Sequence, residues 1–260
     1  MLLRKVNEHF TAQNWGALTL DVIVLVIGVF IGIQVSNWNE VRLTNERGEE
    51  LTERLVADLR EEAWNIASID EYMQDVLDNA ERLRRALAGE SELANADLVI
   101  HAFRASQYLW RPKVRVTYDE LISTGGIGLI TDAELRRAAS IHYNSRAFDD
   151  IQIRGSQSLY RQIFRQIVPT PVHRELGVSC GDRGVVINDL RAVDISINYK
   201  CVSDLSAEKI DATAATIRSN EALLPALRWR IAEIESDLAS ISFADESSGL
   251  HYFHPDGRPE

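Results

Sequence analysis

The sequence contains few basic residues for its length. Its 260 residues include 28 Lys and Arg against 39 Asp and Glu, which gives a formal net charge of −11 at pH 7. A negative surface of this kind repels the phosphates of nucleic acids and of anionic lipid headgroups. We therefore expect no nucleic-acid partner.

The sequence also lacks the short motifs of common catalytic sites. It contains neither G-x-S-x-G nor H-E-x-x-H, the motifs of many hydrolases and zinc peptidases. The run Thr124-Gly-Gly-Ile-Gly128 is not followed by the Lys that a phosphate-binding loop requires, so it indicates a helix end and a turn. His251 and His254 have the spacing of metal ligands, but they stand in a C-terminal segment that we expect to be poorly ordered. We predict a protein that is not an enzyme and has no cofactor or metal site.

Cysteine is scarce, and Cys180 and Cys201 are the only two. They either form a disulfide or remain two separate buried thiols. A disulfide closing a loop of this length would stabilise the fold by about 3 kcal/mol in the loop-entropy account. It would also fit an extracytoplasmic domain, because cytosolic thiols stay reduced. We predict the disulfide.

Against these absences stands one long apolar run. Residues 22–33 are all apolar or glycine, which alone is too short to cross about 30 Å of hydrocarbon. Extended to 16–38, with Asp21 near one end, the segment is long enough. Trp15 and Trp38 then fall at the two membrane interfaces, where indole rings prefer to lie. We predict a transmembrane helix over 16–38, in contact with the lipid bilayer.

Two other interpretations of this run compete with a membrane helix. It could be the core helix of a soluble protein. It could also be a cleaved signal peptide, but the residues after Ile33 contain no small-residue cleavage pattern, so this interpretation is disfavoured.

The predicted membrane helix carries a stripe suited to contact with another helix. Gly28 and Gly32 have the spacing that lets two membrane helices approach closely. At 100° per residue, Asp21 and Asn39 fall on the same stripe. An acidic residue near the membrane surface favours a protein-facing side. We predict that these four residues contact a protein partner or a second copy of the chain. The alternative is that Asp21 reaches the headgroups and the glycines have no role.

The segment from Asp21 to Glu40 resembles the N-terminal hallmark of a bacterial family of unknown function (domain of unknown function 6090). Members carry an acidic residue, an apolar run with an internal Gly, and then Gln-x-x-Asn-Trp-Asn-Glu, which this chain has at residues 34–40. The segment from Tyr118 to Gly126 is similar to a second pattern of that family. The resemblance implies a single-pass membrane protein and brings no established activity.

The orientation in the membrane is not decided by charge. Arg4 and Lys5 precede the apolar run, and Arg42, Arg47 and Arg54 follow it, so the positive-inside count is nearly tied. The cysteine pair and the family resemblance favour a short cytoplasmic N-terminus over 1–15. We predict a bacterial inner-membrane protein whose C-terminal domain lies in the periplasm.

The rest of the chain predicts an all-α fold. Apolar residues recur at three- and four-residue steps, which indicates helices over 41–88, 96–110, 117–123, 131–167 and 207–241, the last kinked at Pro225. Alternating residues indicate a short β segment near 185–202. Residues 243–260 have the composition of a flexible polar tail. We predict an antiparallel helical bundle over 39–242.

These features favour a membrane-anchored helical module that binds a protein partner or itself. A sensory or signal-relay module, acting with another membrane protein, is the alternative, since helical bundles beside membranes can transmit helix movements. An enzyme is the least favoured of the three functions.

Overall fold

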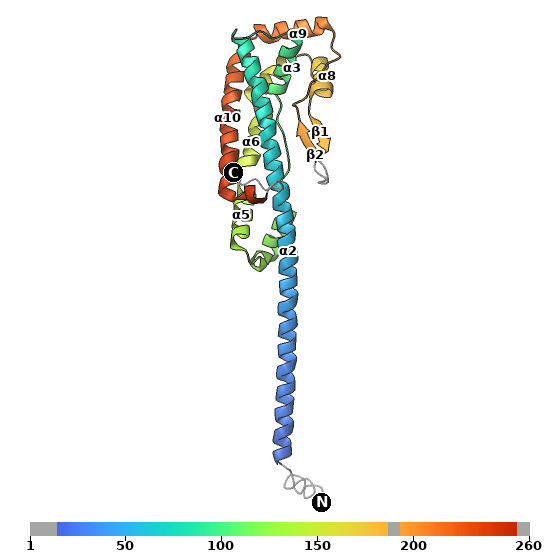
Figure 1. Cartoon of the computed structure of the whole chain (residues 1–260), viewed down its shortest axis with the longest axis vertical. Helices are drawn as coiled ribbons and strands as arrows, with labels where there is room; N and C mark the ends of the chain where they lie inside the picture. The colour runs from blue at the N-terminus through green and yellow to red at the C-terminus, as the bar shows by residue number, and fades with distance from the viewer. Residues whose placement is uncertain (1–14, 187–192, 254–260) are drawn as a thin grey trace, which may run out of the picture.

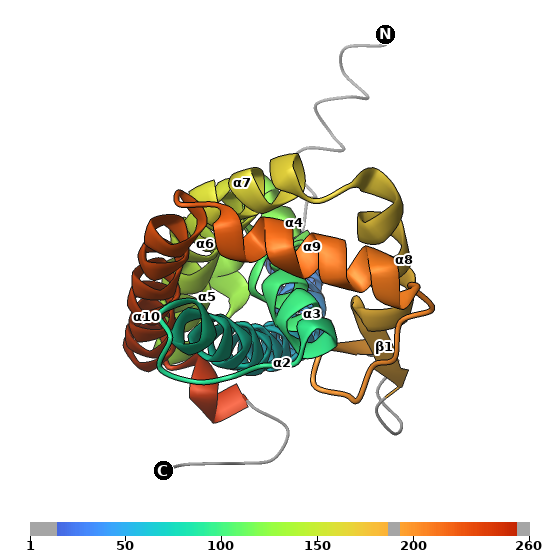
Figure 2. The same cartoon turned by 90° about the horizontal axis from the view of Figure 1, so that it is seen from above.

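The computed structural model describes residues 15–186 and 193–253, with side chains over 19–184 and 195–253. One long helix, α2 (Trp15–Leu87), runs through a helical domain at its C-terminal end and extends alone below it (Figure 1). The fold is all-α apart from one two-stranded sheet, as predicted. Seen from above, α2 lies between α3 and α10 (Figure 2), the two helices that contact it most.

Helix α2 is unbroken across the predicted membrane segment and the first helix of the domain. Its side chains are exposed from Thr19 to Arg47, and Gly48 is the first buried residue. Beyond Gly48 most apolar residues of the repeat are buried, with Leu55 and Leu59 at 0% exposure, while Leu77 and Leu87 are half-buried. The helix ends before Gly89, whose φ of 74° is readily adopted only by glycine. The segment that begins at Thr19 is long and apolar enough to cross a membrane, and none of its apolar window is buried.

Eight further α-helices, two short 3-10 helices and two strands follow α2 among the described residues. They are α3 (Asn95–Ala105), α4 (Val116–Thr124), η1 (Gly126–Leu129), α5 (Ala133–Asn144), α6 (Ala147–Gln157), α7 (Leu159–Ile167), α8 (Thr170–Cys180), β1 (Arg183–Val186), β2 (Val193–Ser196), α9 (Ala207–Ser219), α10 (Leu223–Ser248) and η2 (Leu250–Phe253). Strands β1 and β2 pair antiparallel, with Arg183 opposite Ser196. They lie where the short β segment was expected.

Two of the predicted helices are divided in the structure. The helix expected over 131–167 is three helices, α5, α6 and α7. Ser158 begins α7 by accepting a hydrogen bond from the Arg161 backbone N–H, as an N-cap side chain does. The helix expected over 207–241 divides into α9 and α10 at Asn220, whose side chain accepts from the Ala222 N–H. Polar side chains that bond to nearby backbone N–H groups therefore interrupt these apolar repeats.

The structure corrects the predicted tail between residues 243 and 253. Helix α10 continues to Ser248, Gly249 turns the chain with a φ of 73°, and η2 packs back against α2. Leu250 is fully buried and anchors this turn in the core. A single leucine inside a polar stretch was the signal that the prediction overlooked. Residues 254–260, including His254, lie outside the described residues.

The buried apolar residues form two clusters along the length of α2. The cluster nearer the predicted membrane segment, here called the membrane-proximal cluster, contains α2 residues from Leu51 to Val76 with side chains of α4, α5, α6 and the C-terminal half of α10. The distal cluster contains Ala80 and Leu83 of α2 with side chains of α3, α7, α8, α9 and the start of α10. Helices α2 and α10 therefore connect two separate cores.

A disulfide joins Cys180 and Cys201, as predicted, with their Cα atoms 5.1 Å apart. Cys180 is fully buried in the distal cluster at the end of α8, and Cys201 packs against that cluster. The bond ties the segment after β2 to α8 and so closes the loop that contains both strands.

Candidate interaction site at the foot of the domain

The foot of the domain is the region where α2 leaves the domain towards its exposed apolar part, formed by α4, η1 and α2 residues 43–54. Gly48 lets α2 and η1 approach closely. A Cβ atom at this position would lie 3.0 Å from the Leu129 carbonyl oxygen. The bare helix surface at Gly48 thus lets α2 contact the backbone of η1 directly. A side chain here would push η1 outward.

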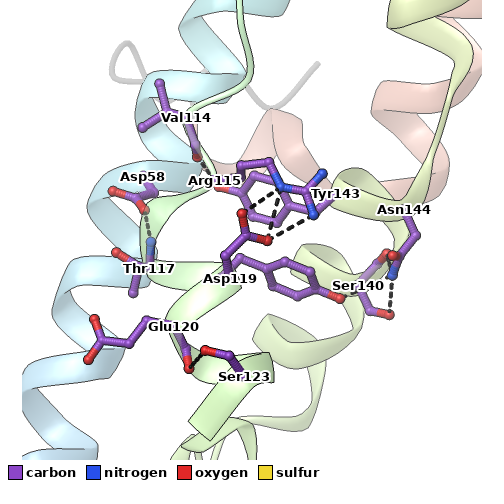
Figure 3. Close-up of polar contacts among 11 residues, drawn as sticks. Asp58, Val114, Arg115, Thr117, Asp119, Glu120, Ser123, Ser140, Tyr143 and Asn144 are labelled. Carbon is purple, nitrogen blue, oxygen red and sulfur yellow. Dashed lines mark hydrogen bonds and ion pairs between the residues drawn. The ribbon is translucent and has the colours of Figure 1, made fainter.

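Helix α4 is fixed to its neighbours by Tyr118, the first residue of the second family-like pattern. Its ring stacks on Tyr143 of α5, with ring centroids 4.7 Å apart. Its hydroxyl accepts a hydrogen bond from Asn144 at 3.0 Å. The Tyr143 hydroxyl in turn donates to the Val114 carbonyl oxygen at 2.8 Å (Figure 3). Burial, with a further contribution from the Glu62 carboxylate, raises the pKa of Tyr143, which therefore stays protonated and keeps donating.

Charged contacts complete the attachment of α4. Asp58 of α2 accepts from the Thr117 backbone N–H at 3.1 Å, and Asp119 accepts two-pronged bonds from Arg115 at 2.9–3.0 Å (Figure 3). Arg54 of α2 forms an ion pair with Glu120 at 2.7 Å. The exposed pairs are each worth at most about 1 kcal/mol, so they set geometry more than stability.

The glycines after α4 end the helix, as the sequence predicted. Gly125 adopts a φ of 72° at the C-cap, and the Thr124 hydroxyl donates to the Glu120 carbonyl oxygen at 2.7 Å. Gly126 is buried, and a Cβ atom there would meet Thr124 at 3.1 Å and Leu51 of α2 at 3.7 Å. The pattern from Tyr118 to Gly126 therefore builds part of the foot of the domain.

A buried acid–imidazole pair lies just above the foot. Glu62 of α2 and Nε2 of His142 of α5 are 2.6 Å apart, with side-chain exposures of 4% and 1%. The other Glu62 oxygen accepts from the Val114 N–H at 2.7 Å. Two adjacent acids on a helix usually point into solvent, as Glu61 does, but Glu62 is buried. The pair therefore joins α2, α5 and the backbone at Val114.

An open groove of about 450 Å³ lies on the outer side of the foot. It is lined by Leu43, Glu46, Arg47, Glu50, Leu51, Arg54 and Glu120. Leu43 offers apolar surface, and the groove carries both signs of charge, with acids in excess. A groove of this composition can receive a protein segment that brings an apolar side chain flanked by charged groups.

The predicted contact stripe continues into this groove. At 100° per residue, Gly28, Gly32 and Asn39 lie within about 40° of one another and of Glu46 and Glu50 around α2. The side chains of Asp21 and Asn39 are exposed, and a Cβ atom at either glycine would meet nothing within 4 Å. One face of α2 therefore runs from the apolar segment to the groove.

Of the two Trp residues predicted at the membrane interfaces, the structure describes the side chain of only one. Trp38 is 71% exposed on α2. Trp15 is the first residue of α2, but its side chain lies outside the described set, as do residues 1–14. Within the described residues, no group of three or more His, Cys, Asp or Glu side chains has the arrangement of a metal site.

Comparison with known proteins adds no relative. No family model, no curated protein and no solved structure matches the chain. The resemblance to the bacterial family of unknown function stays a prediction that rests on the residues quoted for it.

Proposed function

We propose that the protein is a membrane-anchored interaction module, a binding protein rather than an enzyme, which docks a protein partner or a second copy through the stripe face of α2. The observation that carries this proposal is that α2 is a single helix. Its exposed apolar part and its buried domain part share one rigid element. A partner held beside the membrane segment is therefore also held at a fixed position relative to the foot.

The disulfide supports an extracytoplasmic place for the domain. Structural disulfides persist in oxidising compartments such as the periplasm and are rare in the cytosol. The proposed arrangement is a single pass of the bacterial inner membrane, with residues 1–15 in the cytoplasm and the helical domain in the periplasm. Labelling of intact cells with a membrane-impermeant reagent, at a cysteine introduced at exposed Val202, would test it. Labelling only after lysis would contradict the orientation.

The contact face is tested by the mass and composition of the complex extracted from its native membrane in mild detergent. A second protein at fixed stoichiometry makes this chain an accessory subunit, and a homo-oligomer makes it a self-associating anchor. Gly28→Ile and Gly32→Ile should disrupt either complex, because they fill the surface that allows close approach. Val26→Phe is the matched control, since Val26 lies about 200° around the helix from Gly28. A monomer in the unmodified protein would contradict the proposal.

A signal-relay role is the second candidate, and the same continuous helix favours it. A helix without a break can carry a shift or rotation from the distal end of the domain at Leu87 to the membrane segment. Relay requires a second protein to receive the movement. A small molecule that binds the domain and raises Tm would favour this role over simple anchoring.

A further inference from the structure

Helix α10 places two charged side chains inside the domain where it passes from one cluster to the other. Arg230 is 3% exposed and Asp237 1% exposed. Between them, Ile231 belongs to the distal cluster and Ile234 to the membrane-proximal cluster. Buried charges are costly unless their polar atoms are bonded.

Only part of each side chain is bonded to protein. Asp237 Oδ1 accepts from Arg154 Nε at 3.0 Å and from Arg154 Nη2 at 2.5 Å. Arg230 Nη2 donates to the Gln107 carbonyl oxygen at 3.3 Å. Three buried atoms are left without a partner among the described residues: Arg230 Nε, Arg230 Nη1 and Asp237 Oδ2.

A small cavity lies against both side chains. Its volume is about 10 Å³, and Tyr72, Gln107, Gly155, Arg230 and Asp237 line it together with apolar side chains of α2 and α6. This volume is close to that of a single water-sized sphere. Gly155 lets α6 pack closely against Tyr108 in the cavity wall, since a Cβ atom at Gly155 would lie 2.9 Å from the Tyr108 Cβ atom.

We infer that this cavity is a binding site for one ordered water molecule, which accepts a hydrogen bond from the Arg230 guanidinium and donates one to Asp237 Oδ2. Water is the species that can do both at this size. The negative Asp237 carboxylate would repel a halide, and the positive Arg230 guanidinium would repel a metal cation. The water extends a chain of contacts from Arg154 on α6, through Asp237 and Arg230 on α10, to residue 107.

The titration of the two side chains agrees with this assignment. Burial lowers the pKa of Arg230 and raises the pKa of Asp237, in each case as the largest cause. Both charged forms are therefore short of solvation. A bridging water supplies solvation to both without separating α10 from its neighbours.

The first test is a high-resolution structure of the full chain, crystallised from lipid or detergent with bromide in place of chloride. We expect one density peak at hydrogen-bond distance, about 2.7–3.2 Å, from the Arg230 guanidinium and Asp237 Oδ2, without anomalous signal. An anomalous bromide peak there would make it an anion site and overturn the inference. A dry cavity with Arg230 bonded directly to Asp237 would overturn it as well.

The second test follows the water in solution, using full-length protein with ¹⁵N-labelled arginine in detergent micelles. We expect a long-lived water cross-peak to the Arg230 Nε–H, which is lost in Asp237→Leu. Arg154→Ala is the control, because it removes the outer partner of Asp237 and leaves Oδ2 in place. A water cross-peak that survives Asp237→Leu, or its absence in the unmodified protein, would contradict the site. The search for the cross-peak in the unmodified protein is valid even if Asp237→Leu fails to fold.

Discussion

The membrane-proximal and distal clusters share α2 and α10 but are completed by different interactions. The membrane-proximal cluster lies around a buried acid–imidazole pair, Glu62 and His142. The distal cluster contains Cys180, which is bonded covalently to Cys201. One helix therefore belongs to two cores that are vulnerable to different changes. The first depends on both members of a polar pair, and the second depends on an oxidised bond.

The largest effect should come from breaking the polar pair. Glu62→Ala leaves the buried His142 Nε2 and the N–H of half-buried Val114 without their partner, which should lower the free energy of unfolding by about 3 to 5 kcal/mol. Chemical denaturation of the full chain in detergent measures it. Glu61→Ala is the matched control, because Glu61 is exposed and should change the value by less than about 0.5 kcal/mol. Equal effects of the two variants would refute the structural role of Glu62.

The disulfide is the corresponding weakness of the distal cluster. Replacing both Cys180 and Cys201 by Ala should cost about 3 kcal/mol, because the unfolded chain regains the entropy of the open loop. Reductant should lower Tm of the unmodified protein and leave Tm of the double variant unchanged. If the reductant lowered Tm of both proteins, its effect would not come from the Cys180–Cys201 bond.

Gly48 offers a smaller test at the foot of the membrane-proximal half. Gly48→Ala places a methyl group 3.0 Å from the Leu129 carbonyl oxygen, and we expect a net loss of about 1 kcal/mol despite the better helix propensity of Ala. Gly177→Ala in α8 is the control. A Cβ atom there meets nothing within 4 Å, so that substitution should stabilise the fold by about 0.5 to 1 kcal/mol. Stabilisation by both variants would show that η1 does not pack against α2 at this point.

The smallest effect concerns pH and the distal half. Burial, aided by nearby Arg82 and Arg104, lowers the pKa of His101 below its ordinary value of 6.5. The folded state therefore resists protonation of His101 more than the unfolded state does. Its contribution to stability is present above pH 6.5 and is lost as pH falls through the lower folded pKa. His101→Gln should flatten the decline of Tm between about pH 7 and 5. An unchanged slope would exclude His101 as a cause.

Most of α2 could be predicted from its apolar period, whereas α8 and Glu62 could not. No helix was predicted over 170–180, where two Pro residues follow the end of α7. Pro171 in fact lies in the first turn of α8, where a missing N–H costs nothing. Glu62 occupies a place in the apolar repeat between Leu59 and Ile66, and this interruption was the available signal. Its partner His142 lies 80 positions away, so only the tertiary fold reveals the pair.

The exposed part of α2 between the predicted membrane edge and Gly48 also fixes the distance between the apolar segment and the domain. Residues 39–47 rise about 1.5 Å each, so they hold Gly48 about 14 Å from the end of the predicted membrane segment. A helix neither stretches nor folds like a flexible linker, so every copy carries its groove at the same height and at the same angle to the glycine stripe. Deleting residues 39–42, which precede the first groove residue Leu43, would move the foot about 6 Å closer to the predicted membrane segment and turn it by about 40°. A partner that fits both surfaces of the unmodified protein would then fit only one of them.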